Sequence, residues 1–158
     1  MKENRFVVYR LQKLAILLRI LGFDVLYFQN DYISVINLTK REYRILLSRV
    51  KFLRKLPWIF YLDKDDLDGQ LEQIIKELKL KVNKENLFSR CSNCNNFLQK
   101  IKEEEAKGEV PLDVRGRGYW FKKCLNCGKI FWNGNHMPTL EEKLRKTGVI
   151  EEKNEDIR

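Results

Sequence analysis

The sequence predicts an α/β fold, in which a parallel sheet is flanked by helices and a small second module follows. Short apolar segments of strand character alternate with segments whose apolar residues recur at helical spacing over residues 5–78. Such alternation favours a parallel sheet, because parallel strands need crossover connections and these are usually helical. Beyond residue 86 the alternation ends and four cysteines occur as two close pairs. A module of another kind is therefore expected there.

The first half of the chain supplies strands and helices in alternation. Strands are expected in four short segments rich in apolar, β-branched or aromatic residues, namely Arg5–Tyr9, Phe23–Phe28, Tyr43–Leu47 and Trp58–Leu62. Gly22 is placed to end the first helix, and Pro57 to end a short third one. The expected helices are Leu11–Leu21, Asp31–Leu38, Val50–Leu56, and one from Asp65 or Asp66 through Leu78.

The second half is divided differently. The polar segment Lys79–Asn86 lacks clear periodicity, so the first domain is predicted to span residues 1–82 and a small module residues 86–138. Short aromatic strands are expected at Tyr119–Phe121 and Lys129–Trp132, with the charged segment Lys100–Glu109 as a loop or hairpin between strands. Residues 139–158 are predicted to form a short helix and a charged, solvated tail.

The four cysteines carry the clearest chemical signal. Cys91 and Cys94 are separated by two residues, as are Cys124 and Cys127, and each pair presents two thiolates across a tight turn. Two such turns facing each other complete a tetrahedral four-thiolate zinc site, as in a zinc ribbon. No coordination position is left open, so the metal is expected to stabilise the fold. A redox pair is the rival interpretation, but neither pair leads a helix of a thioredoxin-like unit.

Charge and composition point to a polyanionic partner. The chain of 158 residues has a formal charge of +9 at pH 7, and residues 1–62 contain twelve basic residues against four acidic ones. Such a field attracts the phosphates of nucleic acid, although a thermophile surface rich in lysine and glutamate is an alternative for the later part of the chain. No apolar stretch approaches about twenty residues, and no signal-peptide core follows the N-terminus. We expect a cytoplasmic protein without a membrane partner.

Several segments of both halves resemble a known family. They are Lys13–Asp24 (KLAILLRILGFD), Arg44–Arg49 (RILLSR), Gln70–Leu71, Ser89–Asn95 (SRCSNCN), Val110–Pro111 and Cys124–His136 (CLNCGKIFWNGNH). Over roughly residues 5–145 the sequence is similar to the Mut-seven C-terminal RNase domain family. The resemblance implies a PIN-like parallel sheet flanked by helices, followed by a small four-cysteine zinc ribbon.

The carboxylates on which that family's chemistry depends are largely missing. PIN-like nucleases hold divalent metal ions with acids at the strand ends. By the resemblance, the aspartate that ends the first strand falls on Val8, and the one that follows the third strand falls on Val50. Asp24 matches a position that the family uses outside its metal cluster. We assign no catalytic residue, and we expect helix-capping or solvent-facing roles for Asp63, Asp65, Asp66 and Asp68.

Basic residues surround the positions of the lost acids. Arginine and lysine can hold an RNA backbone directly, whereas carboxylates need a metal to tolerate phosphate. Any one of these residues is most simply a solvated surface charge, so the argument rests on their common placement. Trp120 and Trp132 are candidates for base stacking, while Phe121 and Phe131 are expected in the ribbon core. The expected RNA contacts are Arg10, Lys13, Arg49, Lys51, Arg54, Lys55, Arg115, Arg117 and Lys122.

These observations predict a protein that binds structured RNA without cutting it. The preferred partners are ribosomal RNA and neighbouring ribosomal proteins, in a ribosomal or ribosome-associated component that takes no small-molecule substrate. Two other classes stay open. A metal-dependent endoribonuclease of RNA processing or decay would need a relocated carboxylate cluster using Asp31 and Asp63 or Asp65. An antitoxin-like or protein-binding scaffold would instead assemble through apolar surface.

Overall fold

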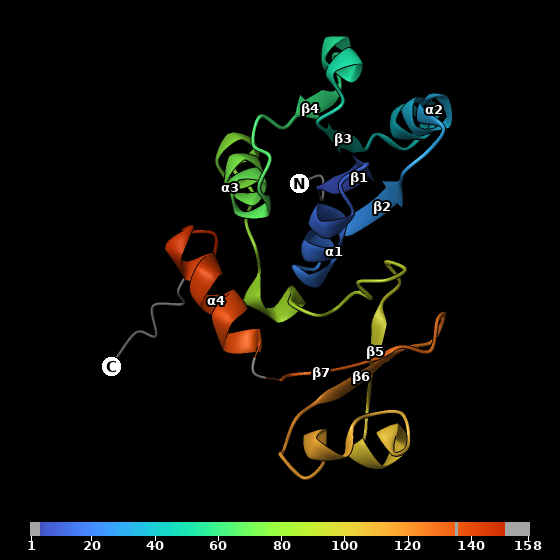
Figure 1. The fold of residues 1–158 in the computed structure, drawn as a ribbon, viewed down its shortest axis with the longest axis vertical. Coiled ribbons are helices and arrows are strands. Elements are labelled where there is room, and N and C mark those ends of the chain that lie inside the picture. The colour runs from blue at the N-terminus through green and yellow to red at the C-terminus, as the bar shows by residue number, and fades with distance from the viewer. Residues whose placement is uncertain (1–3, 135, 151–158) are drawn as a thin grey trace.

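A four-stranded parallel sheet forms the centre of the first half of the protein (Figure 1). The structure is a computed structural model that describes residues 4–134 and 136–150. The strands are β1 (Arg5–Tyr9), β2 (Asp24–Phe28), β3 (Ile45–Ser48) and β4 (Ile59–Tyr61), in the order β2-β1-β3-β4. All neighbours are parallel, and Val8 of β1 pairs with both Tyr27 and Leu47. The predicted α/β class with a parallel sheet is confirmed.

Helices cover both faces of this sheet. Helices α1 (Gln12–Ile20) and α3 (Leu67–Leu78) pack on one face, while α2 (Tyr32–Glu42) and the 3-10 helix η1 (Lys51–Lys55) pack on the other. Successive side chains of a strand point to opposite faces. Phe6 and Val8 of β1 therefore enter the core under α1 and α3, whereas Val7 and Tyr9 enter the core under α2.

The cysteine module is a three-stranded antiparallel sheet. Its strands are β5 (Leu98–Ile101), β6 (Phe121–Cys124) and β7 (Ile130–Trp132), in that order. Strand β5 was not predicted, because its central residues are polar and exposed and only its two ends are half-buried. The 3-10 helices η3 (Glu103–Ala106) and η4 (Leu112–Val114) lie between β5 and β6, within and beyond the segment expected as a loop or hairpin.

One of the two phenylalanines expected in the ribbon core is there. Phe121 is buried with Ala106, Val110 and Ile130. The prediction for Phe131 is wrong, because this side chain is only half-buried and lies outside that cluster. The reason is the two-residue period of a strand: Ile130 points into the cluster, so the next residue of β7 points away from it.

The last helix returns to the first half of the chain. In Figure 1 helix α4 (His136–Lys146) lies beside α3. Leu144 is fully buried in the same core as Leu71 and Ile74, and the backbone of Ile150 bridges to Val82. The charged tail predicted from residue 151 lies outside the described residues, and the division of the chain at residues 82 and 86 stays a prediction. Across the described part of the chain, no helix has the length and apolarity needed to cross a membrane.

Candidate metal centre and nucleic-acid surface

The four cysteines meet between two turns of the ribbon. Cys91 and Cys94 precede β5, Cys124 ends β6, and Cys127 lies in the turn before β7. Their sulfur atoms all lie within 4.8 Å of one another, with Cys91 Sγ 3.7 Å from Cys127 Sγ and Cys94 Sγ 3.3 Å from Cys124 Sγ. A tetrahedral ion with metal–sulfur bonds of about 2.3 Å separates its ligands by about 3.8 Å. The four sulfurs are therefore positioned to bind one metal ion.

The two turns have the same backbone geometry. In each, the residue after the second cysteine has a positive φ, +70° at Asn95 and +78° at Gly128. The backbone N–H of Asn95 donates to the Cys91 carbonyl at 2.9 Å, and that of Gly128 donates to the Cys124 carbonyl at 2.8 Å. Glycine adopts this conformation without strain, and asparagine tolerates it better than most residues. The local sequence thus shapes both turns.

The thiols differ in their readiness to ionise. Burial raises the pKa of Cys91 to about 12, and burial also raises the pKa of Cys124. Burial disfavours the Cys94 thiolate as well, but hydrogen bonds from its neighbours outweigh this and lower its pKa to about 6. A backbone hydrogen bond from Lys129 lowers the pKa of Cys127. Each contacting pair thus joins one thiol whose pKa is raised to one whose pKa is lowered. A bound divalent cation would favour the thiolate form of all four cysteines.

The first cysteine turn supplies a hydrogen-bond partner to the outer edge of strand β2. Strand β2 is an edge strand of the parallel sheet, so its outward backbone groups need other partners. The Val25 N–H donates to Asn95 Oδ1 at 2.9 Å, and the Val25 carbonyl accepts from Arg19 Nε at 2.9 Å. Arg19 Nη1 also donates to the carbonyls of Ser92 and Asn93, at 3.1 and 3.2 Å. Arg19 and Asn95 therefore join the two modules through buried polar contacts.

A carboxylate continues this junction. Asp24, at the start of β2, accepts from Arg44 at 2.9 and 3.2 Å and from Asn95 Nδ2 at 2.8 Å. Burial disfavours the Asp24 carboxylate, but these hydrogen bonds and the Arg44 charge outweigh it, so its pKa is lowered. Asp24 thus lies at the amino end of β2, away from the carboxyl ends of the strands. Its contacts with Arg44 and Asn95 stabilise the junction between the sheet and the ribbon. Local sequence patterns carry no signal for this role, because the partners lie 20 and 71 positions away.

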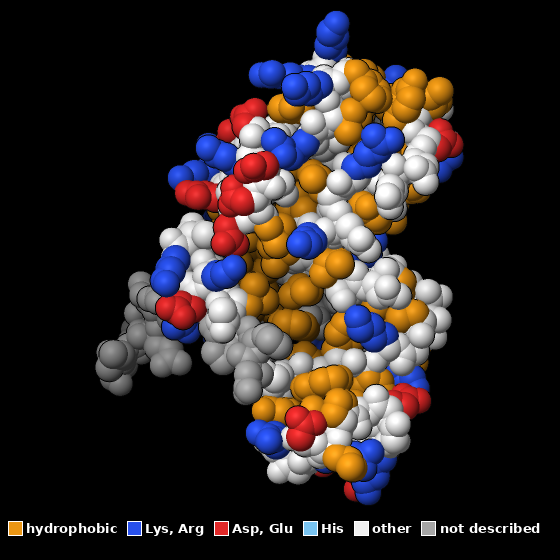
Figure 2. Space-filling view, in the orientation of Figure 1, with side chains coloured by type: hydrophobic (Ala, Val, Ile, Leu, Met, Phe, Trp, Pro, Cys, Tyr) orange, Lys and Arg blue, Asp and Glu red, His pale blue; other side chains and the backbone are white. Residues whose placement is uncertain are grey.

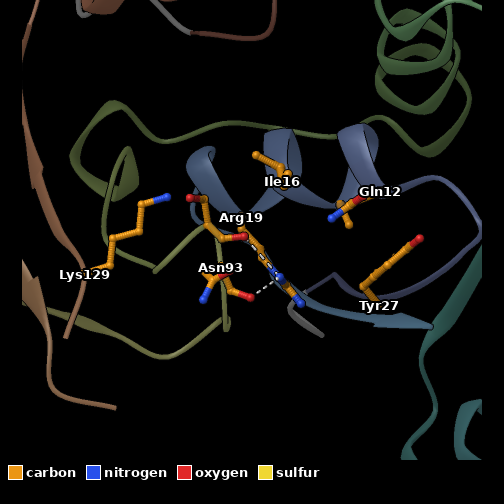
Figure 3. Close-up of a pocket in the computed structure, with 8 residues that line it drawn as sticks. Gln12, Ile16, Arg19, Tyr27, Asn93 and Lys129 are labelled. Carbon is orange, nitrogen blue, oxygen red and sulfur yellow. Dashed lines mark hydrogen bonds between the residues drawn. The ribbon is translucent and has the colours of Figure 1, made fainter. Parts of the chain in front are cut away.

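A small hollow marks the same junction. Figure 3 shows Gln12, Ile16 and Arg19 from α1 facing Asn93 and Lys129 of the ribbon, with Tyr27 of β2 at one side. Its volume is about 110 Å³, which is below the range of about 300–1,000 Å³ typical of ligand pockets. The hollow is therefore too small for a nucleotide.

The carboxyl edge of the parallel sheet is the expected place for a ligand. In open α/β sheets ligands bind where the strand order reverses, and here β1 and β3 are the neighbours whose connections run in opposite directions. Ser48 is fully buried at this point, with its hydroxyl donating to the Tyr9 carbonyl at 3.2 Å. Val8 is 0% exposed within the apolar core, and Val50 is half-buried beside Leu53. The two positions matched to lost aspartates are thus apolar and packed.

The nearby acids have structural partners. Asp31 accepts hydrogen bonds from the hydroxyl and the backbone N–H of Ser34, and these lower the pKa of Asp31 while it caps α2. Asp66 accepts from the Gly69 N–H at 2.8 Å and caps α3. Asp65 and Asp66 were the two residues predicted to begin this helix, and Asp66 is the one that caps it.

Two acids of the nuclease alternative lie at opposite sides of the sheet's carboxyl edge. Asp31 follows β2 and Asp63 follows β4, which are the two outer strands. Three inter-strand spacings separate these strands by about 14 Å, and neither acid belongs to a gathered set of metal-ligand atoms among the described residues. Asp63 Oδ2 instead accepts from Gln73 Nε2 at 3.5 Å. Among the side chains that the structure describes, the four cysteines form the one gathered set of three or more Cys, His, Asp or Glu ligand atoms.

Two of the predicted RNA contacts lie where the strand order reverses. Arg10 follows β1 and donates through Nε to the Gln29 carbonyl at 3.0 Å, and Arg49 follows β3 and donates to the Leu62 carbonyl at 3.3 Å. Each guanidinium has five N–H donors, so one such bond orients the group and leaves other donors for a ligand. Lys13 is exposed on the neighbouring helix α1.

Helix η1 adds an exposed mixture of basic and aromatic side chains. Figure 2 shows Lys and Arg gathered beside hydrophobic side chains at the end of the molecule where Figure 1 places η1. Tyr32 and Phe52 are 42% and 55% exposed and contact edge to face, with ring centroids 5.0 Å apart. Sequence reasoning missed this pair, although an aromatic residue inside a basic run was a usable signal. The predicted contacts exposed on η1 are Lys51, Arg54 and Lys55.

The predicted RNA contacts of the ribbon lie away from η1, and some of them already form hydrogen bonds within the protein. Arg115 and Arg117 follow η4, at the opposite end of the molecule from η1 (Figure 1). Lys122 is half-buried and donates to the Phe88 carbonyl at 2.9 Å. Burial, followed by the charge of Lys100, lowers the pKa of Lys122. The structure therefore does not bring the nine predicted RNA contacts together on one surface.

The fold and the metal centre together define an α/β domain joined to a four-cysteine, metal-binding ribbon. The family model described as the Mut7-C RNAse domain matches residues 4–144. The protein therefore belongs to the Mut7-C RNase domain family, an RNA-related, nuclease-like family. No curated protein and no solved structure matches the chain significantly.

Proposed function

We propose that this protein binds structured RNA, preferentially ribosomal RNA, without cutting it. In this proposal it is a cytoplasmic ribosomal or ribosome-associated component that contacts neighbouring ribosomal proteins. One observation carries the proposal: Arg10 and Arg49 lie where the strand order reverses, and no carboxylate cluster gathers there among the described residues. Guanidinium groups hold phosphate directly, so RNA can be bound there without a metal ion.

The packing around the lost acids supports binding without cleavage. Two-metal cleavage depends on clustered carboxylates that hold the ions beside the scissile phosphate. Val8 is fully buried in an apolar core, and the carboxylate of Asp31 caps a helix. Restoring a metal cluster would therefore require repacking of the core as well as a change of side chain.

Zinc is the metal we propose for the four cysteines. Four thiolates in a tetrahedral arrangement are typical of zinc or iron–sulfur sites, and the two tight turns between antiparallel strands are typical of a zinc ribbon. Cys91 and Cys124 are fully buried, so the ion would be enclosed by the protein on that side. Its role would be to hold β5, β6 and β7 together next to the parallel sheet.

The proposal is tested in native cells with a tagged protein. We expect the wild type to sediment with one ribosomal subunit, to leave it after RNase treatment, and to crosslink to one region of ribosomal RNA. A double variant Arg54→Gln, Lys55→Gln should sediment less with the subunit, because it removes two charges from η1. The matched control Lys143→Gln, Lys146→Gln removes two charges from α4, which lie beside Asp68 and Glu142. A protein that neither sediments with a subunit nor crosslinks to any RNA would contradict the proposal.

A second function follows from the family itself. A metal-dependent endoribonuclease of RNA processing or decay is supported by the match to an RNase domain. The purified protein would then cut RNA in the presence of manganese, and Asp31→Asn would abolish the cleavage. Asparagine also caps helices, so this substitution preserves α2. Cleavage that depends on both manganese and Asp31 would replace RNA binding as the proposed function.

A further inference from the structure

A large groove lies at the amino edge of the parallel sheet, opposite to the carboxyl edge. Its walls are the starts of β1 and β2, the turn that follows α1, the segment that follows α3, and the approach to the first cysteine turn. The groove has a volume of about 670 Å³, within the range of about 300–1,000 Å³ of known ligand pockets. It is roomy enough for a nucleotide.

The groove is strongly basic. Four cations line it, and Asp24 is the one acid among its described lining residues. Asp24 accepts hydrogen bonds from Arg44 and Asn95, and Arg44 also pairs with Glu42, so one acid stands against four cations in the groove. A cavity with a surplus of positive charge favours an anionic ligand. The four cations are Arg5, Lys79, Lys81 and Arg90.

An exposed aromatic ring stands at the groove. Phe97 is 68% exposed, although it lies beside the buried first cysteine turn. The guanidinium of Arg90 lies 4.1 Å from the centroid of the Phe97 ring. Arg90 is held in place by donating to the carbonyls of Gly22 and Asn95, at 3.3 and 3.1 Å. An aromatic ring and a fixed guanidinium plane are the two groups on which unpaired bases stack.

Another part of the groove wall is fixed by a close backbone contact. Gly22 has a φ of +97°, and a Cβ there would lie 2.5 Å from the Asn86 carbonyl oxygen. The N–H of Phe88 donates to the Ile20 carbonyl at 2.8 Å. These contacts join the end of α1 to the segment before the cysteine turn. The groove therefore exists before a ligand binds, which lowers the cost of binding.

We propose that this groove binds one unpaired nucleotide of an RNA strand, with its base on Phe97 and its phosphate among Arg5, Lys79 and Lys81. The proposal rests on the proposed function, since it assigns a second contact to the same RNA-binding protein. It is separate from the carboxyl edge, because parallel strands place their two ends at opposite edges of the sheet. An RNA bound at both edges would pass around the end of the sheet.

Binding of a labelled eight-nucleotide single-stranded RNA, measured by fluorescence anisotropy, tests this assignment. Phe97→Leu keeps an apolar side chain and removes the ring, and it should weaken binding about tenfold. Phe97→Tyr keeps the ring and should bind like the wild type, so that a loss confined to Phe97→Leu follows from the missing ring. Crosslinking with mass spectrometry should place the RNA on the peptide that contains Phe97.

Salt dependence tests the phosphate contact. Lys79 has a φ of +50°, so Lys79→Asn removes the charge with a residue that tolerates this conformation. The slope of log K against log salt concentration should become shallower by about 0.7. The matched control is Lys76→Gln on α3, which removes a lysine paired with Glu72 outside the groove and should leave the slope unchanged.

The outcomes separate this proposal from the proposed function. Wild-type RNA binding that is unchanged by Phe97→Leu and Lys79→Asn, with crosslinks elsewhere, would overturn the groove assignment and leave RNA binding intact. No RNA binding by the wild type would overturn both. Displacement of the RNA by adenosine monophosphate at similar concentrations would show that the groove takes a free nucleotide, which also overturns the assignment to an RNA strand.

Discussion

Replacing Asn95 by alanine is the sharpest test of how the cysteine ribbon is joined to the parallel sheet. The Asn95 side chain accepts from the buried Val25 N–H at 2.9 Å and donates to Asp24 at 2.8 Å. Its backbone holds a φ of +70° in the turn that carries Cys91 and Cys94. Alanine removes both hydrogen bonds and is strained at this φ, so three effects act in the same direction.

The expected loss follows from these contacts. A buried backbone N–H left without an acceptor costs about 1–3 kcal/mol. Alanine in the left-handed region costs about 1–2 kcal/mol, a strain that asparagine tolerates better. Asp24 keeps its Arg44 partner, so its loss of one donor adds less. We expect Asn95→Ala to lower the free energy of unfolding by about 3 kcal/mol in total.

The assay is urea unfolding of the full chain with excess zinc in the buffer, followed by circular dichroism. Asn95→Gly is the matched variant, because glycine adopts a positive φ without strain. It should be about 1 kcal/mol more stable than Asn95→Ala, since it loses the hydrogen bonds alone. A wild-type stability for Asn95→Ala would refute the role of the Val25 contact. Equal losses for the two variants would refute the contribution of backbone strain.

Three further predictions concern other parts of the molecule. Hydrogen bonds from Ser34 lower the pKa of Asp31, so the stabilisation by this carboxylate should be fully present above about pH 4 and be lost as the pH falls through the depressed folded-state pKa. Carboxyl carbon NMR of the wild type measures the pKa of Asp31, and unfolding of Asp31→Asn at the same pH values is the control. An Asp31 pKa at its ordinary value would contradict this prediction. Val8→Asp should lower the free energy of unfolding by about 3 kcal/mol or more, because an acid would enter an apolar core, and no manganese-dependent nuclease activity should appear. Elemental analysis should find about one zinc per chain; Cys127→Ser should reduce this content while Leu125→Ala, also exposed in the same turn, should not.

The two edges of the parallel sheet share a combination of side chains that bears on RNA recognition. The carboxyl edge carries exposed cations beside the aromatic pair Tyr32 and Phe52, and the amino edge carries the groove at Phe97. Both combine positive charge with an exposed ring, the combination that suits unpaired nucleotides. A folded RNA with several unpaired positions could contact both edges at once.

Periodicity in the sequence predicted the main elements of the first half, because the spacing of apolar residues is a local property. Arg5–Tyr9 is a strand in both the prediction and the structure, and Asp66 begins a helix as expected. Strand β5 was missed because a half-exposed strand of four residues has too weak a pattern. Phe131 was misplaced because its role depends on which face of β7 is buried.

By itself the sequence determined the α/β class, the family, and a four-cysteine cluster able to hold a metal ion, since two cysteines in one tight turn are brought together by the turn itself. Only the tertiary structure decided what joins the modules and where the charges lie. Asn95 meets Val25 across 70 positions, and Leu144 enters the core of the first half. The strand order places Asp31 and Asp63 after opposite outer strands. Such pairings depend on the packing of whole elements against one another, which local sequence patterns do not encode.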